Sequence, residues 1–131
     1  MPTHYEILPD QAYIHVHYQG AITAAEIKDM FNTFRASSDF DPALPHLADL
    51  SDMTGTDAGF ADFFSVFSLF SRAYAETETG LRCAIFAPDN TTFGLARIFE
   101  NLTETSNVVV TRLFDDLDDA IAWVCTVDRG A

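Results

Sequence analysis

Apolar and polar residues follow two periods along the chain, and these periods predict an alternating series of strands and helices. Alternation with period two, or a short continuous apolar run, predicts strands at residues 4–8, 12–18, 46–50, 81–87 and 108–114. Apolar residues spaced by three and four predict helices at residues 24–35, 60–74, 92–103 and from 115 onward. This order predicts an α/β fold with four helices and a mixed five-stranded sheet, mostly parallel with an antiparallel first strand.

The stretch from His46 to Tyr74 dominates the predicted core. A short apolar strand leads into a polar segment, Ser51 to Asp57, which we expect to be a loop, and then into a helix rich in phenylalanine. Thr56 or Asp57 is expected to cap the start of that helix. Burial of one phenylalanine contributes about 1.5–3 kcal/mol. The helix should therefore be the largest single contributor to the core, through Phe60, Phe63, Phe64, Phe67 and Phe70.

The segment between this strand and helix is the first place where we expect a partner or ligand to bind. Ligands of open α/β sheets meet the carboxyl ends of the strands. Carboxylates in this segment would repel a bare phosphate and favour a basic protein surface or a cation. The alternative is that these residues only turn the chain and cap the helix. The candidate residues are Asp49, Ser51, Asp52, Thr54, Thr56 and Asp57.

Local signals also mark the ends of the other helices. Thr23 and Glu26 have the spacing of a capping box before the first helix. Residues 88–91 supply caps for the third helix. Gly94, inside the first turn of that helix, lowers helix stability, which suggests that another backbone packs closely against it. At the start of the chain, Pro9 predicts a tight turn between the first two strands.

Candidate chemistry is sparse. His15 and His17 share one strand face, as the first two ligands of a metal site would, but the sequence places no third ligand beside them, so a surface pair is favoured. Asp49 and Ser51 share a strand face while His46 lies on the other, which does not support a catalytic triad. Phosphate-loop, G-x-S-x-G, HExxH and CxxC motifs are absent from the sequence. We therefore predict no enzyme, no catalytic residue, no metal and no cofactor.

Length, composition and charge narrow the class of protein. The 131 residues predict a single domain, 1–131, and a hydrophobic content of 48% excludes a largely disordered chain. No apolar run reaches bilayer length and no secretion signal begins the chain, so a cytoplasmic protein is expected. The formal net charge of −13 disfavours nucleic acid as a partner. Cys83 and Cys125 lie in apolar runs without metal-ligand spacing and are expected to be small buried hydrophobes.

With these elements in order, the chain resembles the SpoIIAA-like superfamily, the STAS domain group that shares its fold with CRAL-TRIO lipid-binding domains. The resemblance spans nearly the whole chain and is greatest to small, stand-alone, uncharacterised bacterial members. The segments that carry it are Tyr18-Gln19-Gly20 with Thr23, Leu47-Ala48-Asp49-Leu50-Ser51, Ala87-Pro88-Asp89 with Phe93 to Phe99, and Phe114 with Ala120-Ile121-Ala122-Trp123.

The resemblance implies a regulatory, protein-binding module, with one departure from the pattern. Anti-sigma-factor antagonists of this group carry a phosphorylatable serine directly after the position of Asp57, where this chain has Ala58 and then Gly59. We therefore expect a non-enzymatic interaction module, acting on an unknown protein partner without the usual serine switch. The alternative is a small apolar ligand or lipid bound in a cleft lined by the five phenylalanines, and that same face could instead form a homodimer interface or only core.

Overall fold

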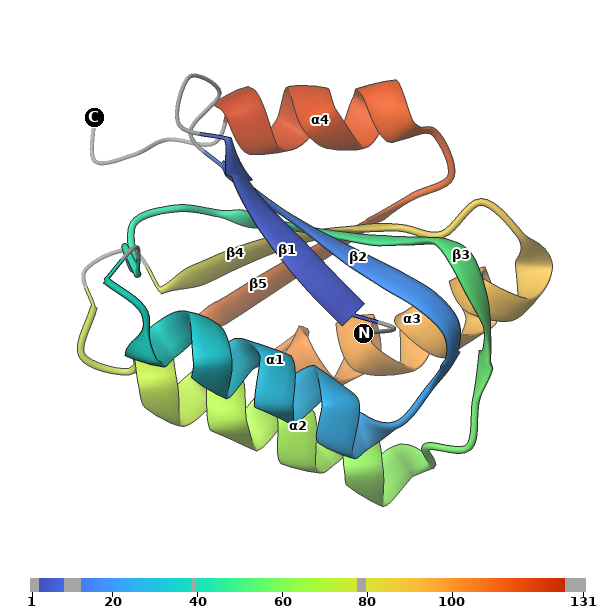
Figure 1. Cartoon of the computed structure of the whole chain (residues 1–131), viewed down its shortest axis with the longest axis horizontal. Coiled ribbons are helices and arrows are strands. Elements are labelled where there is room, and N and C mark those ends of the chain that lie inside the picture. Colours follow the sequence, from blue (N-terminus) through green and yellow to red (C-terminus); the bar gives the residue numbers. More distant parts are fainter. Residues whose placement is uncertain (1–2, 9–12, 39, 78–79, 127–131) are drawn as a thin grey trace.

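The fold is that of an α/β sandwich in which one mixed sheet separates two unequal layers of helices (Figure 1). It is taken from a computed structural model that describes residues 3–8, 13–38, 40–77 and 80–126. The strands are β1 (Thr3–Leu8), β2 (Tyr13–Ile22), β3 (His46–Thr56), β4 (Leu81–Phe86) and β5 (Val109–Phe114). The helices are α1 (Ala24–Ala36), α2 (Phe60–Tyr74), α3 (Asn90–Thr103) and α4 (Leu117–Thr126).

The sheet confirms the predicted fold class. Its strands lie in the order β1-β2-β3-β4-β5, with β1 antiparallel to β2 and every later pair parallel. Because the strand order advances in one direction, crossovers of one handedness place α1, α2 and α3 on the same face. Figure 1 shows α4 alone on the opposite face. None of the helices in the described residues is long and apolar enough to span a membrane.

Two apolar clusters lie on the two faces of the sheet. The larger one packs α1, α2 and α3 against the sheet and includes Phe31, Phe34, Phe70 and Tyr74. The smaller one packs α4 against β2, β3 and β4, and its buried members are Tyr13, Leu47, Ala84, Ala120 and Val124. Cys83 belongs to the larger cluster and Cys125 packs against the smaller, so the sheet lies between the two sulfur atoms.

The predicted loop from Ser51 to Asp57 is wrong for most of its length. β3 continues through Thr56, and β2 continues past Tyr18 to Ile22, so the two strands remain paired to the end. The pairing continues through Gly20, two residues past the predicted end of the strand at Tyr18, because register shifts on either side of Gly20 absorb the irregularity. Its φ of 74° is one that glycine adopts without strain. The predicted turn at residues 9–11 lies outside the described residues.

The residues that cap the helix starts agree with the prediction for α1 and α3 but not for α2. Thr23 forms the predicted capping box with Glu26, and Asp89 caps α3 through the Thr92 amide. Neither Thr56 nor Asp57 caps α2, which begins after Gly59. The carboxylate of Asp62 accepts a hydrogen bond from the Gly59 amide instead, because strand pairing already holds Thr56.

Two glycines differ in what their backbone requires. Gly80 precedes β4 with φ at 66°, and a Cβ there would lie 2.2 Å from the carbonyl oxygen of Val108. Gly94 in α3 has nothing within 4 Å of such a Cβ, so the predicted close packing at Gly94 is wrong. Gly94 therefore only lowers helix stability.

These surroundings predict opposite effects for the same substitution. Gly80→Ala should lower the free energy of unfolding by at least about 1–3 kcal/mol, because it combines backbone strain with a clash. Gly94→Ala should raise it by about 0.5–1 kcal/mol through helix propensity. Urea denaturation of both variants measures the difference, and a destabilised Gly94→Ala variant would contradict the open space found around that residue.

Candidate functional site

The polar residues predicted as a partner site lie along the second half of β3. The side chains of Ser51, Asp52, Thr54 and Asp57 are exposed, consistent with a surface available to a partner. Thr56 is half-buried and has a structural role: its hydroxyl donates to the carbonyl oxygen of Ile22 and accepts from the Ala58 amide.

Asp49 is the exception among the predicted partner-site residues. It is only 7% exposed and points to the face of the sheet that carries α4. Its carboxylate still contacts the first of the exposed residues, because the Ser51 hydroxyl and amide both donate to Oδ1.

The five phenylalanines of α2 do not line a single cleft. Phe63 and Phe70 are buried against the sheet, and Phe67 is half-buried against the same core. Phe60 and Phe64 are 65% and 51% exposed, one helical turn apart at the start of the helix. The structure therefore divides the predicted apolar face into a buried stripe and an exposed pair that directly follows β3.

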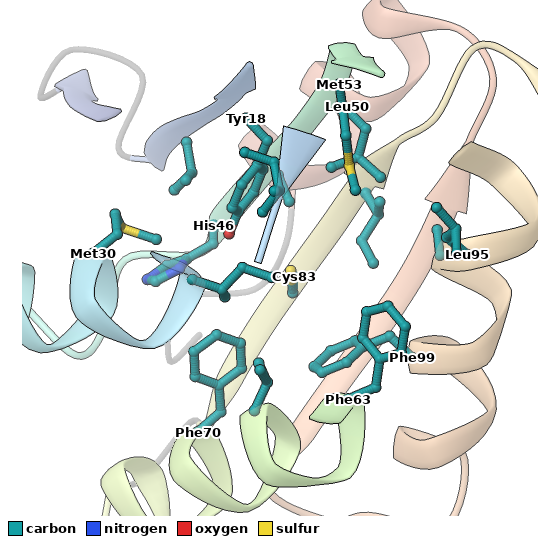
Figure 2. A pocket seen from close by; sticks show the side chains of 17 residues that line it. Tyr18, Met30, His46, Leu50, Met53, Phe63, Phe70, Cys83, Leu95 and Phe99 are labelled. Carbon is teal, nitrogen blue, oxygen red and sulfur yellow. The ribbon is translucent and has the colours of Figure 1, made fainter. Parts of the chain in front are cut away.

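A cavity of about 90 Å³ lies beneath the buried stripe, between the sheet and helices α1, α2 and α3 (Figure 2). The second halves of β2 and β3 bend toward the helices (Figure 1), and they supply Ile22, Leu50 and Met53 to the lining. Its lining is almost entirely apolar, with the two thioethers of Met30 and Met53 among its walls. The side chains labelled around it are Tyr18, Met30, His46, Leu50, Met53, Phe63, Phe70, Cys83, Leu95 and Phe99.

The polar groups of the cavity are held in uncharged forms by burial. Desolvation lowers the pKa of His46 from 6.5 to about 4 and raises the pKa of the Cys83 thiol to about 12. The His46 Nε2 atom lies 3.3 Å from the hydroxyl of the fully buried Tyr74. The cavity therefore provides neither a charge nor an activated nucleophile, and its chemistry is that of an apolar binding space.

A second group of side chains lies on the opposite face of the sheet, beside α4. His15 and His17 of β2 and Asp49 of β3 offer three ligand atoms that all lie within 4.8 Å of one another. The imidazole rings are stacked, with centroids 4.0 Å apart, and His15 Nε2 lies 2.8 Å from Asp49 Oδ2. The parallel register sets His17 opposite Asp49 and so assembles the group.

Hydrogen bonds keep the Asp49 carboxylate ionised in this group. Burial alone would raise its pKa, but hydrogen bonds from His15 and from the Ser51 hydroxyl and amide outweigh burial and lower the pKa to about 2. Because the Ser51 hydroxyl donates to Asp49 at 2.6 Å rather than to a histidine, these residues do not form a nucleophile and base pair. His46 lies on the other face, as predicted.

The sequence identified the residues of this group as candidates but did not predict that the fold brings them together. It placed His15 with His17, and Asp49 with Ser51, on strand faces, yet found no third ligand for the histidines. The missing information was the β2–β3 register, which pairs Val16 with Ala48 and His17 with Asp49. Of the five phenylalanines predicted to line a cleft, Phe63 and Phe70 line the cavity. The rest of its lining was not predicted, because no sequence pattern shows where packed side chains leave a gap.

Comparisons with known proteins agree with the fold. A family model described as SpoIIAA-like matches residues 13–125. The chain is also similar to the crystal structure of an uncharacterized protein from the DUF3478 family with a SpoIIAA-like fold, from Shewanella loihica PV-4. That match has a TM-score of 0.60 and 18% sequence identity, and covers 94% of this chain and 92% of the other. No curated protein sequence matches the chain.

The buried His46 predicts a pH dependence of stability. Its folded pKa of about 4 lies below the unfolded value of 6.5, so between these values the unfolded chain binds more protons and stability falls as the pH falls. The difference corresponds to about 3 kcal/mol between pH 7 and pH 4. We therefore expect the free energy of unfolding, measured by urea denaturation, to fall more steeply with falling pH in the wild type than in His46→Gln across this range. Parallel pH profiles would mean that His46 titrates normally in the folded protein.

Proposed function

Since the chain belongs to the SpoIIAA-like family, we propose that it acts as a non-enzymatic protein-interaction module of the STAS type. The partner surface would be the exposed second half of β3 together with the start of α2, here called the β3–α2 strip. The strip comprises Ser51, Asp52, Thr54, Asp57, Phe60 and Phe64.

The observation that carries the proposal is the exposure of Phe60 and Phe64 beside carboxylates. Large aromatic side chains are common anchors of protein interfaces. Phe60 and Phe64 are both at least half exposed and lie one helical turn apart, so together they present a compact apolar surface to a partner. Their rings do not contribute to the main core, in contrast to Phe67 and Phe70 on the same helix. A role in binding would explain why two large apolar side chains are exposed at these positions.

The backbone of β3 supports the same surface. Within the described residues, β4 pairs with β3 only from His46 to Asp49, whereas β2 pairs with β3 as far as Thr56. Beyond Asp49 the strand therefore has a paired neighbour on one side only. Such edges accept main-chain hydrogen bonds from partner segments.

Charge favours a partner of different composition over a second copy. Asp52, Asp57 and Asp62 are exposed within or beside the strip, on a chain with a net charge of −13. Two copies that met through the strip would bring these carboxylates together, which costs free energy. We therefore assign the strip to a protein with an apolar pocket surrounded by lysine or arginine.

A charge reversal on the strip tests this assignment. Immobilised Asp57→Lys protein should lose the partner proteins that the wild type captures from a lysate of the source cells, because the new lysine repels a basic surface. Phe60→Ser combined with Phe64→Ser should lose the same proteins through the apolar contact. Quantitative mass spectrometry of the captured proteins gives the comparison.

Glu76→Lys is the matched control, since Glu76 is exposed just after the far end of α2 and the change in charge is identical. It should retain the captured proteins. Equal loss in both lysine variants would attribute capture to net charge and overturn the proposal. A wild-type dimer in light scattering that the double serine variant dissociates would instead assign the strip to self-association.

A second candidate function rests on the cavity, which has the composition of an apolar ligand site. Apolar cavities of roughly 150 Å³ bind molecules the size of benzene. At about 90 Å³ this one fits only a smaller group unless its walls move. The flexible side chains of Met30 and Met53 would permit that movement. The ligand class would be a small apolar molecule or the end of an acyl chain.

Filling the cavity tests this second candidate. Native mass spectrometry should detect a co-purifying small molecule, or added decanoate should bind to the wild type in calorimetric titration. Ala48→Leu, from the cavity wall, should weaken decanoate binding at least about tenfold, since the added carbons occupy the site. Thermal unfolding of the variant would establish that it is folded. Equal decanoate binding by a folded Ala48→Leu variant would place the ligand elsewhere.

A further inference from the structure

The polar group beside α4 has the composition and support of a metal site. We propose that His15, His17 and Asp49 bind a divalent transition-metal ion of the zinc class, on the face of the sheet opposite the apolar cavity. The inference does not rest on the protein-interaction proposal, because none of the three ligands belongs to the β3–α2 strip. Ser51 of the strip contacts the group only through its hydrogen bonds to Asp49.

The distances are close to those that a bound ion requires. Ligand atoms about 2.0–2.1 Å from a tetrahedral ion lie roughly 3.3 Å from one another. Asp49 Oδ2 lies 2.8 Å from His15 Nε2 and 3.9 Å from His17 Nδ1, and the largest separation in the group is at most 4.8 Å. The two separations from Asp49 Oδ2 therefore lie on either side of the spacing that an ion requires.

Hydrogen bonds from neighbouring residues set which atom of Asp49 and of His17 faces the group. The Ser51 hydroxyl and amide both donate to Asp49 Oδ1, so Oδ2 is the oxygen that faces the histidines. The Glu6 carboxylate lies 3.2 Å from His17 Nε2, so Nδ1 is the nitrogen that faces Asp49. A carboxylate on the outer nitrogen of a ligating histidine is the usual outer-shell arrangement of protein metal sites.

The donor set selects the class of ion. Two imidazoles and one carboxylate suit Zn²⁺ and Fe²⁺, whereas Ca²⁺ and Mg²⁺ prefer sites built from oxygen. Three protein ligands leave a coordination position for water or a further ligand. The side chain of His17 is 24% exposed, against 12% for His15 and 9% for Asp49, so ions would enter from the side of His17.

The competing explanation is a hydrogen-bonded cluster that never holds an ion. It accounts for the contact between His15 and Asp49. The contact between His15 and Asp49 would form without His17, whose Nδ1 faces Asp49 and whose Nε2 faces the Glu6 carboxylate. The metal explanation gives a role to His17 Nδ1, which lies 3.9 Å from Asp49 Oδ2, too far for a direct hydrogen bond.

Titration of the purified, chelator-treated full chain with Co²⁺ and Zn²⁺ tests the proposal. Co²⁺ should bind one to one, with visible absorption bands of a low-coordinate ion that Zn²⁺ displaces. His17→Asn should weaken binding at least about tenfold, the size of effect that even outer-shell partners exert. His17 is the most exposed ligand, so the variant is the one that disturbs folding least.

Asp52→Asn is the matched control, because it removes an exposed carboxylate from the same strand outside the cluster. It should change the affinity by less than about twofold. Equal weakening by Asp52→Asn and His17→Asn would show diffuse attraction to an acidic protein and overturn the proposal. Long-range ¹H–¹⁵N spectra of the wild type provide a second measurement: Zn²⁺ should shift His15 Nε2 and His17 Nδ1, and unchanged ring nitrogens would also overturn it.

Discussion

The parallel pairing of β2 with β3 is the constraint on which every feature of interest depends. It extends from Ile14 and His46 to Ile22 and Thr56, through two register shifts. The shifts let the paired strands bend out of the plane of the sheet without separating. If the pairing ended at Tyr18, the second half of β3 would be a loop without a fixed face, and neither the cavity nor the β3–α2 strip would have its present shape.

Because successive side chains of a strand point to opposite faces, this one pairing produces two chemically different environments. Ala48 and Leu50 face the apolar cavity, while Asp49 between them faces His15 and His17. The separation also places two histidines in different surroundings. His46 is desolvated among aromatic rings, whereas His15 has a carboxylate within hydrogen-bond distance. One alternating sequence of β3 therefore specifies an apolar face and a polar one.

The sequence predicted the fold well because its signals were local and mutually consistent. The Thr23 capping box, the apolar run of β4 and the spacing of Met30, Phe31 and Phe34 each specify an element from nearby residues. The β3–α2 segment was harder, since polar residues and Gly55 suggest a loop unless a partner strand is known. Its strand character comes from β2, and such nonlocal pairing overrides local propensity. For the same reason the meeting of His15, His17 and Asp49 required the register.

The high net charge of this protein opposes the self-association that its exposed aromatic residues would favour. Phe60 and Phe64 present apolar area that would promote self-association of a neutral protein. Twenty acidic residues against seven basic ones give the chain a long-range repulsion between copies. The repulsion acts before two apolar surfaces can touch, whereas a basic partner experiences attraction over the same distance. An acidic surface thus opposes the contact between identical copies that the phenylalanines would otherwise favour, and the proposed basic partner would meet no such repulsion.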